Sequence, residues 1–177
     1  MRTPARALLD SPSTRPPMLR ALTLAAALAL PAARHAGAQD RFTPAIAGAP
    51  ESTVRNGYVV NHRREAVQRE LTARPPTEAE LGVRLPAGAQ LRAELTARQI
   101  VQYHPVWRVY QYRVALSKEE LARHFTGQGL RYEASEGRVY FPGATREQGD
   151  FMDGLGDAAL GGFRIWRALP EGAAGRR

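Results

Sequence analysis

The sequence predicts an α+β fold: a small antiparallel sheet of about four or five strands, packed by one or two helices, after an N-terminal signal peptide. Three observations carry this prediction. A capped amphipathic helix begins near Ser117, segments rich in aromatic and β-branched residues lie on both sides of it, and the order helix, hairpin, helix, hairpin, loop, strand is typical of an antiparallel sheet with helices on one face. The length of 177 residues fits one domain with a short appendage.

The N-terminal segment 1–38 has the pattern of a secretory signal peptide. Met18 to Arg20 gives a short positive start, and an uncharged apolar run of 13 residues follows, ending at Ala33. Small residues then favour cleavage between Ala38 and Gln39. The apolar run is too short to span a bilayer, which takes about 20 residues. We therefore expect a periplasmic or secreted protein with no transmembrane segment in the mature chain; Met1 and Met18 both stay open as the start.

The net charge of the chain is halved when residues 1–38 are removed. The whole sequence has 25 basic and 17 acidic residues, for a net charge of +8. Residues 1–38 hold five arginines and one aspartate, which leaves the mature chain 20 basic and 16 acidic residues. The acids are interspersed among the bases, whereas phosphate binding needs bases grouped on one face. We predict no nucleic-acid partner, and the lack of cysteine excludes a disulfide scaffold or thiolate chemistry.

The mature chain begins with a segment, 39–53, rich in Ala, Pro and Gly, which we predict to be a flexible lead. The single α+β domain is expected over 54–169 and a disordered tail over 170–177. A first helix is predicted over 61–73, because Val67 and Leu71 share one face and two prolines follow. Thr77 and Glu80 then have capping-box spacing for a short turn closed by Gly82.

The next expected feature is a hairpin, broken at His104-Pro105, between strands 94–103 and 107–114. The second strand is rich in aromatic and β-branched residues, as strands prefer. The first strand is ambiguous, because Leu91 and Leu95 also have helical spacing, so residues 89–103 stay open between strand and helix.

Ser117 begins the best-marked helix, with a capping box to Glu120 and an end at Gly127 or Gly129. A second hairpin is predicted over 130–141, with a three-residue turn that ends in Gly137. Residues 143–160 are expected to be loop or a short helix, and residues 162–167 a last strand.

The candidate binding residues are four large aromatic side chains on these strands: Trp107, Tyr110, Tyr112 and Trp166. In the strand over 107–114 the aromatic residues point to both faces, so both faces need cover. The helix from Ser117 covers one face, and the second is covered by the first helix or free for a partner. We therefore favour a non-enzymatic binding module of the cell envelope, whose partner is an envelope protein or a small ligand.

The alternative is a small cation-dependent hydrolase centred on Asp150, Asp153 and Asp157, together with a histidine. Three carboxylates separated by glycines within eight residues have the oxygen ligands that Ca²⁺ takes, although their spacing departs from the EF-hand pattern. No serine elbow, glycine-rich dinucleotide motif or P-loop is present in the sequence. An enzyme is therefore the second hypothesis, with Ca²⁺ as its candidate cofactor and no assigned catalytic residue.

Overall fold

A computed structural model describes residues 40–147 and 149–169; the predicted signal peptide and the predicted tail lie outside these ranges. The helices are Thr43–Ala47 (α1), His62–Ala73 (α2), Glu78–Leu81 (α3), Ala93–Tyr103 (α4) and Lys118–Thr126 (α5). The strands are Thr53–Arg55 (β1), Tyr58–Val60 (β2), Gln90–Leu91 (β3), Trp107–Arg113 (β4), Arg131–Glu133 (β5), Arg138–Tyr140 (β6), Phe151–Asp157 (β7) and Gly162–Ala168 (β8). The α+β class is confirmed, with more strands and helices than predicted.

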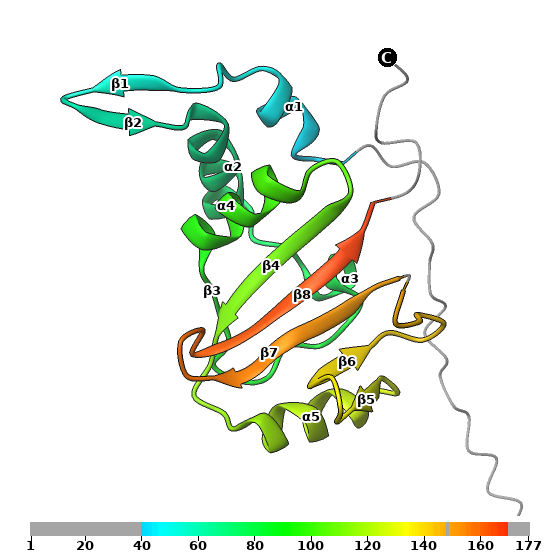
Figure 1. Cartoon of the computed structure of the whole chain (residues 1–177). Helices are drawn as coiled ribbons and strands as arrows, with labels where there is room; N and C mark the ends of the chain where they lie inside the picture. The colour runs from blue at the N-terminus through cyan, green and yellow to red at the C-terminus, as the bar shows by residue number, and fades with distance from the viewer. Residues whose placement is uncertain (1–39, 148, 170–177) are drawn as a thin grey trace, which may run out of the picture. The chain divides into compact units, whose positions relative to one another are not determined.

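The main sheet has six strands in the order β3-β4-β8-β7-β6-β5, and all its pairings are antiparallel (Figure 1). Strands β5 to β8 follow one another as a meander, and β8 then pairs with β4 over seven residues, from Trp107↔Ala168 to Arg113↔Gly162. Because side chains alternate along a strand, this register puts Tyr110, Tyr112, Phe163 and Ile165 on one face and Trp107 and Trp166 on the other.

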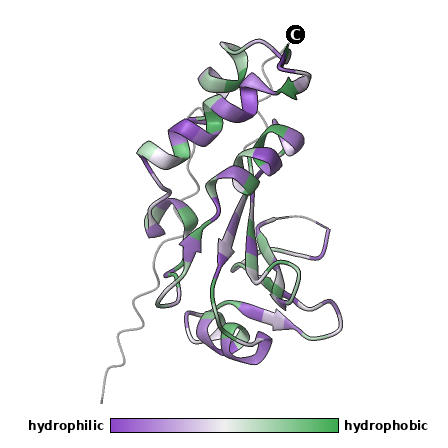
Figure 2. Cartoon of the chain, turned by 90° about the vertical axis from the view of Figure 1, so that its left-hand side faces the viewer, coloured by the Kyte–Doolittle hydropathy of each residue, from purple (hydrophilic) through white to green (hydrophobic). Residues whose placement is uncertain are grey.

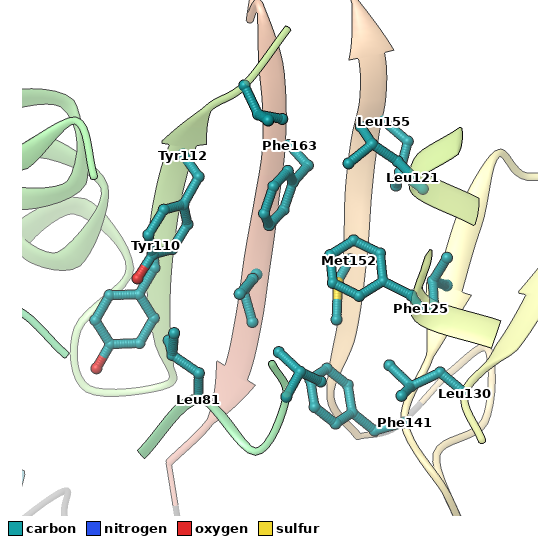
Figure 3. Close-up of a cluster of buried hydrophobic side chains, with 14 of the residues drawn as sticks. Leu81, Tyr110, Tyr112, Leu121, Phe125, Leu130, Phe141, Met152, Leu155 and Phe163 are labelled. Atoms are coloured by element: carbon teal, nitrogen blue, oxygen red, sulfur yellow. The ribbon is translucent and has the colours of Figure 1, made fainter. Parts of the chain in front are cut away.

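The hydrophobic core lies on the Tyr110 face of the sheet (Figure 3). Helix α5 covers this face with Leu121 and Phe125, and α3 contributes Leu81; all three side chains are fully buried. Burying a leucine or phenylalanine side chain stabilises the fold by roughly 1.5–3 kcal/mol. The prediction that the helix from Ser117 covers one sheet face is confirmed.

Both predicted capping boxes are present. The Ser117 Oγ accepts a hydrogen bond from the Glu120 amide while the Glu120 carboxylate accepts one from the Ser117 amide, and Thr77 and Glu80 repeat this arrangement at α3. The second hairpin is also confirmed, with Gly137 at a φ of 63°, but the turn between Glu133 and Arg138 has four residues instead of three.

Helix α4 occupies the segment 94–103, for which a strand was the first interpretation, so the predicted hairpin with 107–114 is wrong. The helical face consists of Thr96, Ala97 and Ile100, all buried. The helix lies along the outer edge of β4, where the Thr96 Oγ1 accepts a hydrogen bond from the Gln111 amide. Strand β4 instead pairs with the short β3 at one end and along its whole length with β8, far along the chain, which the local sequence pattern could not show.

Strand β7 occupies residues predicted as loop or short helix. The sequence did not indicate this strand because it contains glycines, which are depleted in strands. The pairing with β8 is irregular between Asp153 and Asp157, where Gly156 has a φ of 65°. A Cβ atom on Gly156 would lie 2.6 Å from the Lys118 amide nitrogen, so only glycine fits here. The bulge lets β7 pass close to the start of α5.

The segment after the predicted cleavage site differs from the flexible lead that we expected. The first described residue, Asp40, is 1% exposed, Phe42 is fully buried in the core, and α1 follows. The C-terminal end of this segment, residues 51–53, is exposed. Residues 40–47 are thus part of the packed fold.

Helix α2 and the hairpin of β1 and β2 are not part of the main sheet. Helix α2 packs on α4 and α1 and turns Val67 and Leu71 inward. Figure 2 shows the side formed by α2 and α4, where hydrophilic and hydrophobic residues are mixed. Strands β1 and β2 form a separate two-stranded hairpin around Asn56 and Gly57, both at positive φ. No helix among the described residues is long and apolar enough to cross a membrane.

Candidate functional site: the open face of the sheet

The second face of the sheet, which we call the open face, carries the side chains that point away from the core. In Figure 1 this face is turned toward the viewer, and no helix crosses in front of β8 and β7. The expectation that the helix over 61–73 covers part of this face is not met, because α2 packs on α1 and α4 instead. On β8 and β7 the open face is therefore without a covering helix among the described residues.

Four half-buried aromatic rings form one cluster on the open face, which we call the aromatic cluster: Tyr103, Trp107, Phe151 and Trp166. The rings of Phe151 and Trp166 are directly opposite in the β7–β8 register and stack with their centroids 5.4 Å apart and 11° between their planes. Trp107 meets both rings edge-on, at 5.8 and 6.0 Å. Tyr103, at the end of α4, closes the cluster 5.0 Å from Trp166.

Arginine–carboxylate pairs surround the aromatic cluster. The two oxygens of Asp153 accept hydrogen bonds from Arg164 at 2.8 and 2.9 Å, and one of them also accepts the Trp166 indole N–H at 3.0 Å. On the other side, the Arg138 guanidinium lies 4.7 Å from the centre of the Phe151 ring. Such bidentate and cation–π contacts hold the rings in fixed orientations.

The rim continues over β6, where Tyr140 lies under the Arg131 guanidinium at 4.9 Å. The Tyr140 hydroxyl donates to Glu136, whose carboxylate also pairs with Arg138 and Arg146. Arg131 pairs likewise with Glu133, so the arginines around the aromatic cluster and along this rim have carboxylate neighbours.

The four predicted binding residues divide between the two faces. Trp107 and Trp166 belong to the aromatic cluster, whereas Tyr110 and Tyr112 are 1% and 2% exposed in the core, out of a partner's reach. Burial raises the pKa of Tyr110, although Arg108 works in the opposite direction, and burial together with Tyr110 raises that of Tyr112. Both phenols therefore stay neutral in the folded protein.

The three predicted metal-ligating aspartates are not brought together. Asp153 is engaged by Arg164 and Trp166, as described above. Asp150 pairs with Arg167 at 3.2 Å and accepts the Ala168 amide, and Asp157 accepts the amides of the turn that follows it. Within residues 40–147 and 149–169, no three His, Cys, Asp or Glu side chains are arranged to hold a metal ion. The geometry gives no support to the Ca²⁺ site or to the hydrolase centred on these residues.

Sequence reasoning missed Tyr103, Phe151 and Arg164 as members of this site. The alternation in the last predicted strand already placed Arg164 on the side of Trp166. Phe151 had no such signal, because glycines concealed its strand, and Tyr103 lies in a segment that the sequence left open between strand and helix.

Comparison with protein-family models, with curated proteins and with solved structures found no match. Function therefore has to be argued from the residues of this chain. What the open face offers chemically is contact: fixed aromatic rings, paired arginines and carboxylates.

Proposed function

We propose that this chain is a protein-binding module of the cell envelope, exported by its N-terminal signal, and that it binds its partner through the open face. The observation that carries the proposal is the aromatic cluster, which is half-buried and extends over β8 and β7, in front of which no described helix crosses. Large apolar groups grouped on a surface and rimmed by polar residues are typical of interaction sites.

The composition of the face favours a protein over a small ligand. Interfaces between proteins are enriched in Trp, Tyr, Phe and Arg, with a polar rim around a desolvated centre. Trp107, Phe151 and Trp166 supply such a centre, and the Asp153–Arg164 pair supplies part of the rim. Phe151, at the centre of the cluster, offers no free ring face on which a sugar could stack, because Trp166 stacks on it and the Arg138 guanidinium lies over it.

Export is the second part of the proposal and rests on the sequence of residues 1–38, which lie outside the described residues. N-terminal sequencing of the protein recovered from cells tests it. A mature chain that begins at Gln39 is expected, and a chain that still contains Leu24 would contradict export by this signal.

Site-specific photo-crosslinking in the producing cell tests the binding surface. A photoreactive amino acid replaces Ala168, which is exposed and lies opposite Trp107 in the register. The matched control carries it at Arg123, exposed on α5. We expect one defined adduct from position 168, no such adduct from position 123, and loss of the adduct when Trp107→Ala is added to a chain whose circular dichroism is unchanged. Equal adducts from both positions, or none from 168, would contradict the proposal.

A further inference from the structure

The β1–β2 hairpin and helix α2 enclose a shallow, open hollow of about 770 Å³, which we call the hairpin hollow. It has no part in the proposed open-face function. Its lining is polar and comes from one hairpin residue, Arg55, and from one side of α2: His62, Glu65, Gln68, Arg69, Thr72 and Ala73.

Two guanidinium groups in the hairpin hollow have no carboxylate paired with them. Arg55 on β1 and Arg69 on α2 have no ion-pair or hydrogen-bond partner among residues 40–147 and 149–169. The one carboxylate in the lining, Glu65, is already paired with His62 at 3.3 Å. The hollow therefore carries an excess of positive charge supplied by arginines, which suit planar carboxylate groups.

The hairpin above the hollow has free backbone edges. Within the described chain, β1 pairs with β2 alone. Because Arg55 and Tyr58 flank a two-residue turn and exchange hydrogen bonds, the amide and carbonyl of Val54 point outward from the edge of β1. A two-stranded hairpin is marginally stable in water, and an unpaired edge is a template for another strand.

The two sides of the hairpin differ in chemistry. The Thr53 Oγ1 contacts the His62 Nε2 at 2.6 Å, so Thr53 and Arg55 share the side that faces α2. Val54 and Val59 lie opposite each other on the other side and are 73% and 72% exposed. A strand added to β1 would place alternate side chains beside Arg55 and beside this valine pair.

We propose that the hairpin hollow binds an extended, acidic segment of a partner protein, which adds to the free edge of β1. Its carboxylates lie toward Arg55 and Arg69, and its intervening apolar side chains cover Val54. The segment therefore alternates acidic and apolar residues, and its backbone pairs with that of Val54 in the antiparallel direction, so that an apolar residue opposite Val54 exchanges both hydrogen bonds with it. Strand addition of this kind gains affinity from the main chain and specificity from alternate side chains.

The test uses a fluorescein-labelled nonapeptide of alternating glutamate and valine and measures its anisotropy with the whole mature chain at low salt. We expect saturable binding, and binding about tenfold weaker for Arg55→Glu and for Arg69→Glu, a loss of about 1.4 kcal/mol, because each change removes a charged hydrogen bond to the peptide. The matched control Arg123→Glu, on an exposed site of α5, is expected to leave binding unchanged. Trp107→Ala should also leave it unchanged, which separates this site from the open face.

Four comparison probes make the test specific. A peptide of the same composition with its glutamates and valines in separate blocks should bind at least about tenfold more weakly, since alternation is lost. N-methylation of the valine amides should abolish binding, while N-methylation of the glutamate amides should not. No binding of the alternating peptide would overturn the proposal, as would equal binding of the block peptide. Tighter binding of a nine-nucleotide oligothymidylate, lost in Arg55→Glu, would overturn it in favour of a nucleic-acid site.

Discussion

The carboxylate of Asp40 lies 2.7 Å from the Nε of Arg108 on β4, and the Asp40 side chain is fully buried. The contact is an ion pair without hydrogen-bond geometry, and the other Asp40 oxygen lies 3.9 Å from the His104 Nε2. Asp40 is the second residue after the predicted cleavage site. Cleavage at the predicted site would therefore leave a single residue before a buried, ion-paired side chain.

Replacing Asp40 by asparagine should destabilise the protein by about 2 to 3 kcal/mol. The change keeps the shape of the side chain but leaves the Arg108 guanidinium, which is 21% exposed, without its carboxylate. Urea unfolding of the mature chain measures the effect. Glu119→Gln, on the exposed face of α5, is the control and should be neutral. A neutral Asp40→Asn would show that residues 40–42 are not anchored as described.

The two core tyrosines should respond oppositely to loss of their hydroxyls. The Tyr112 hydroxyl is buried without a hydrogen-bond partner, so Tyr112→Phe should leave stability unchanged or raise it. The Tyr110 hydroxyl interacts with Arg108, and Tyr110→Phe should cost about 1 kcal/mol. Thermal unfolding of the two variants measures both effects. A larger loss of stability for Tyr112→Phe than for Tyr110→Phe would contradict these hydroxyl contacts.

Alkaline pH should unfold the protein through the same residues. Because burial raises the pKa of both tyrosines, each contributes stability that is present below the ordinary phenol pKa of about 10 and is lost as the pH rises above it. The loss should be smaller in the double variant Tyr110→Phe/Tyr112→Phe. A stability profile that is identical in the double variant and the parent chain from pH 9 to pH 11 would refute this origin.

Acid should weaken the contact between α3 and residue 41. Burial alone would raise the pKa of Glu80, but hydrogen bonds from Thr77 and the guanidiniums of Arg41 and Arg74 outweigh it, so the pKa is lowered. The resulting stability is present above the unfolded carboxylate pKa of about 4.3 and is lost as the pH falls below it. Glu80→Gln should flatten this part of the pH profile in urea titrations, while exposed Glu51→Gln should not; equal flattening in both would sink the explanation.

The capped start of α5 is the element that sequence reasoning placed best. Ser117→Ala should cost about 1 kcal/mol, because the Glu120 amide would lose its acceptor. The exposed Ser52→Ala serves as a control for the loss of a serine hydroxyl. Unfolding curves that coincide for Ser117→Ala and the parent chain would mean that the capping box does not stabilise the helix.

The sequence predicts those elements that are marked by residues close together in the chain, and it does not predict contacts between distant segments. Ser117, Thr77 and Gly137 carry local signals, a cap or a turn, that act within a few residues, and the elements that they mark were placed correctly. The pairing of Trp107 with Ala168 and of Phe151 with Trp166 joins distant segments, so the open face could not be assembled from local patterns. The Asn56-Gly57 turn is a local signal that was overlooked, since asparagine followed by glycine favours a two-residue hairpin.

Tryptophan fluorescence tests the central claim about the open face most directly, because the two tryptophans of the chain, Trp107 and Trp166, both lie in the aromatic cluster. The measurement compares acrylamide quenching of the free chain with that of the complex with the protein captured through position 168, after its own tryptophan emission has been subtracted. We predict a blue-shifted emission and weaker quenching in the complex, because the partner excludes water from both rings. An emission maximum and quenching constant that do not change at saturation would show that the partner binds elsewhere.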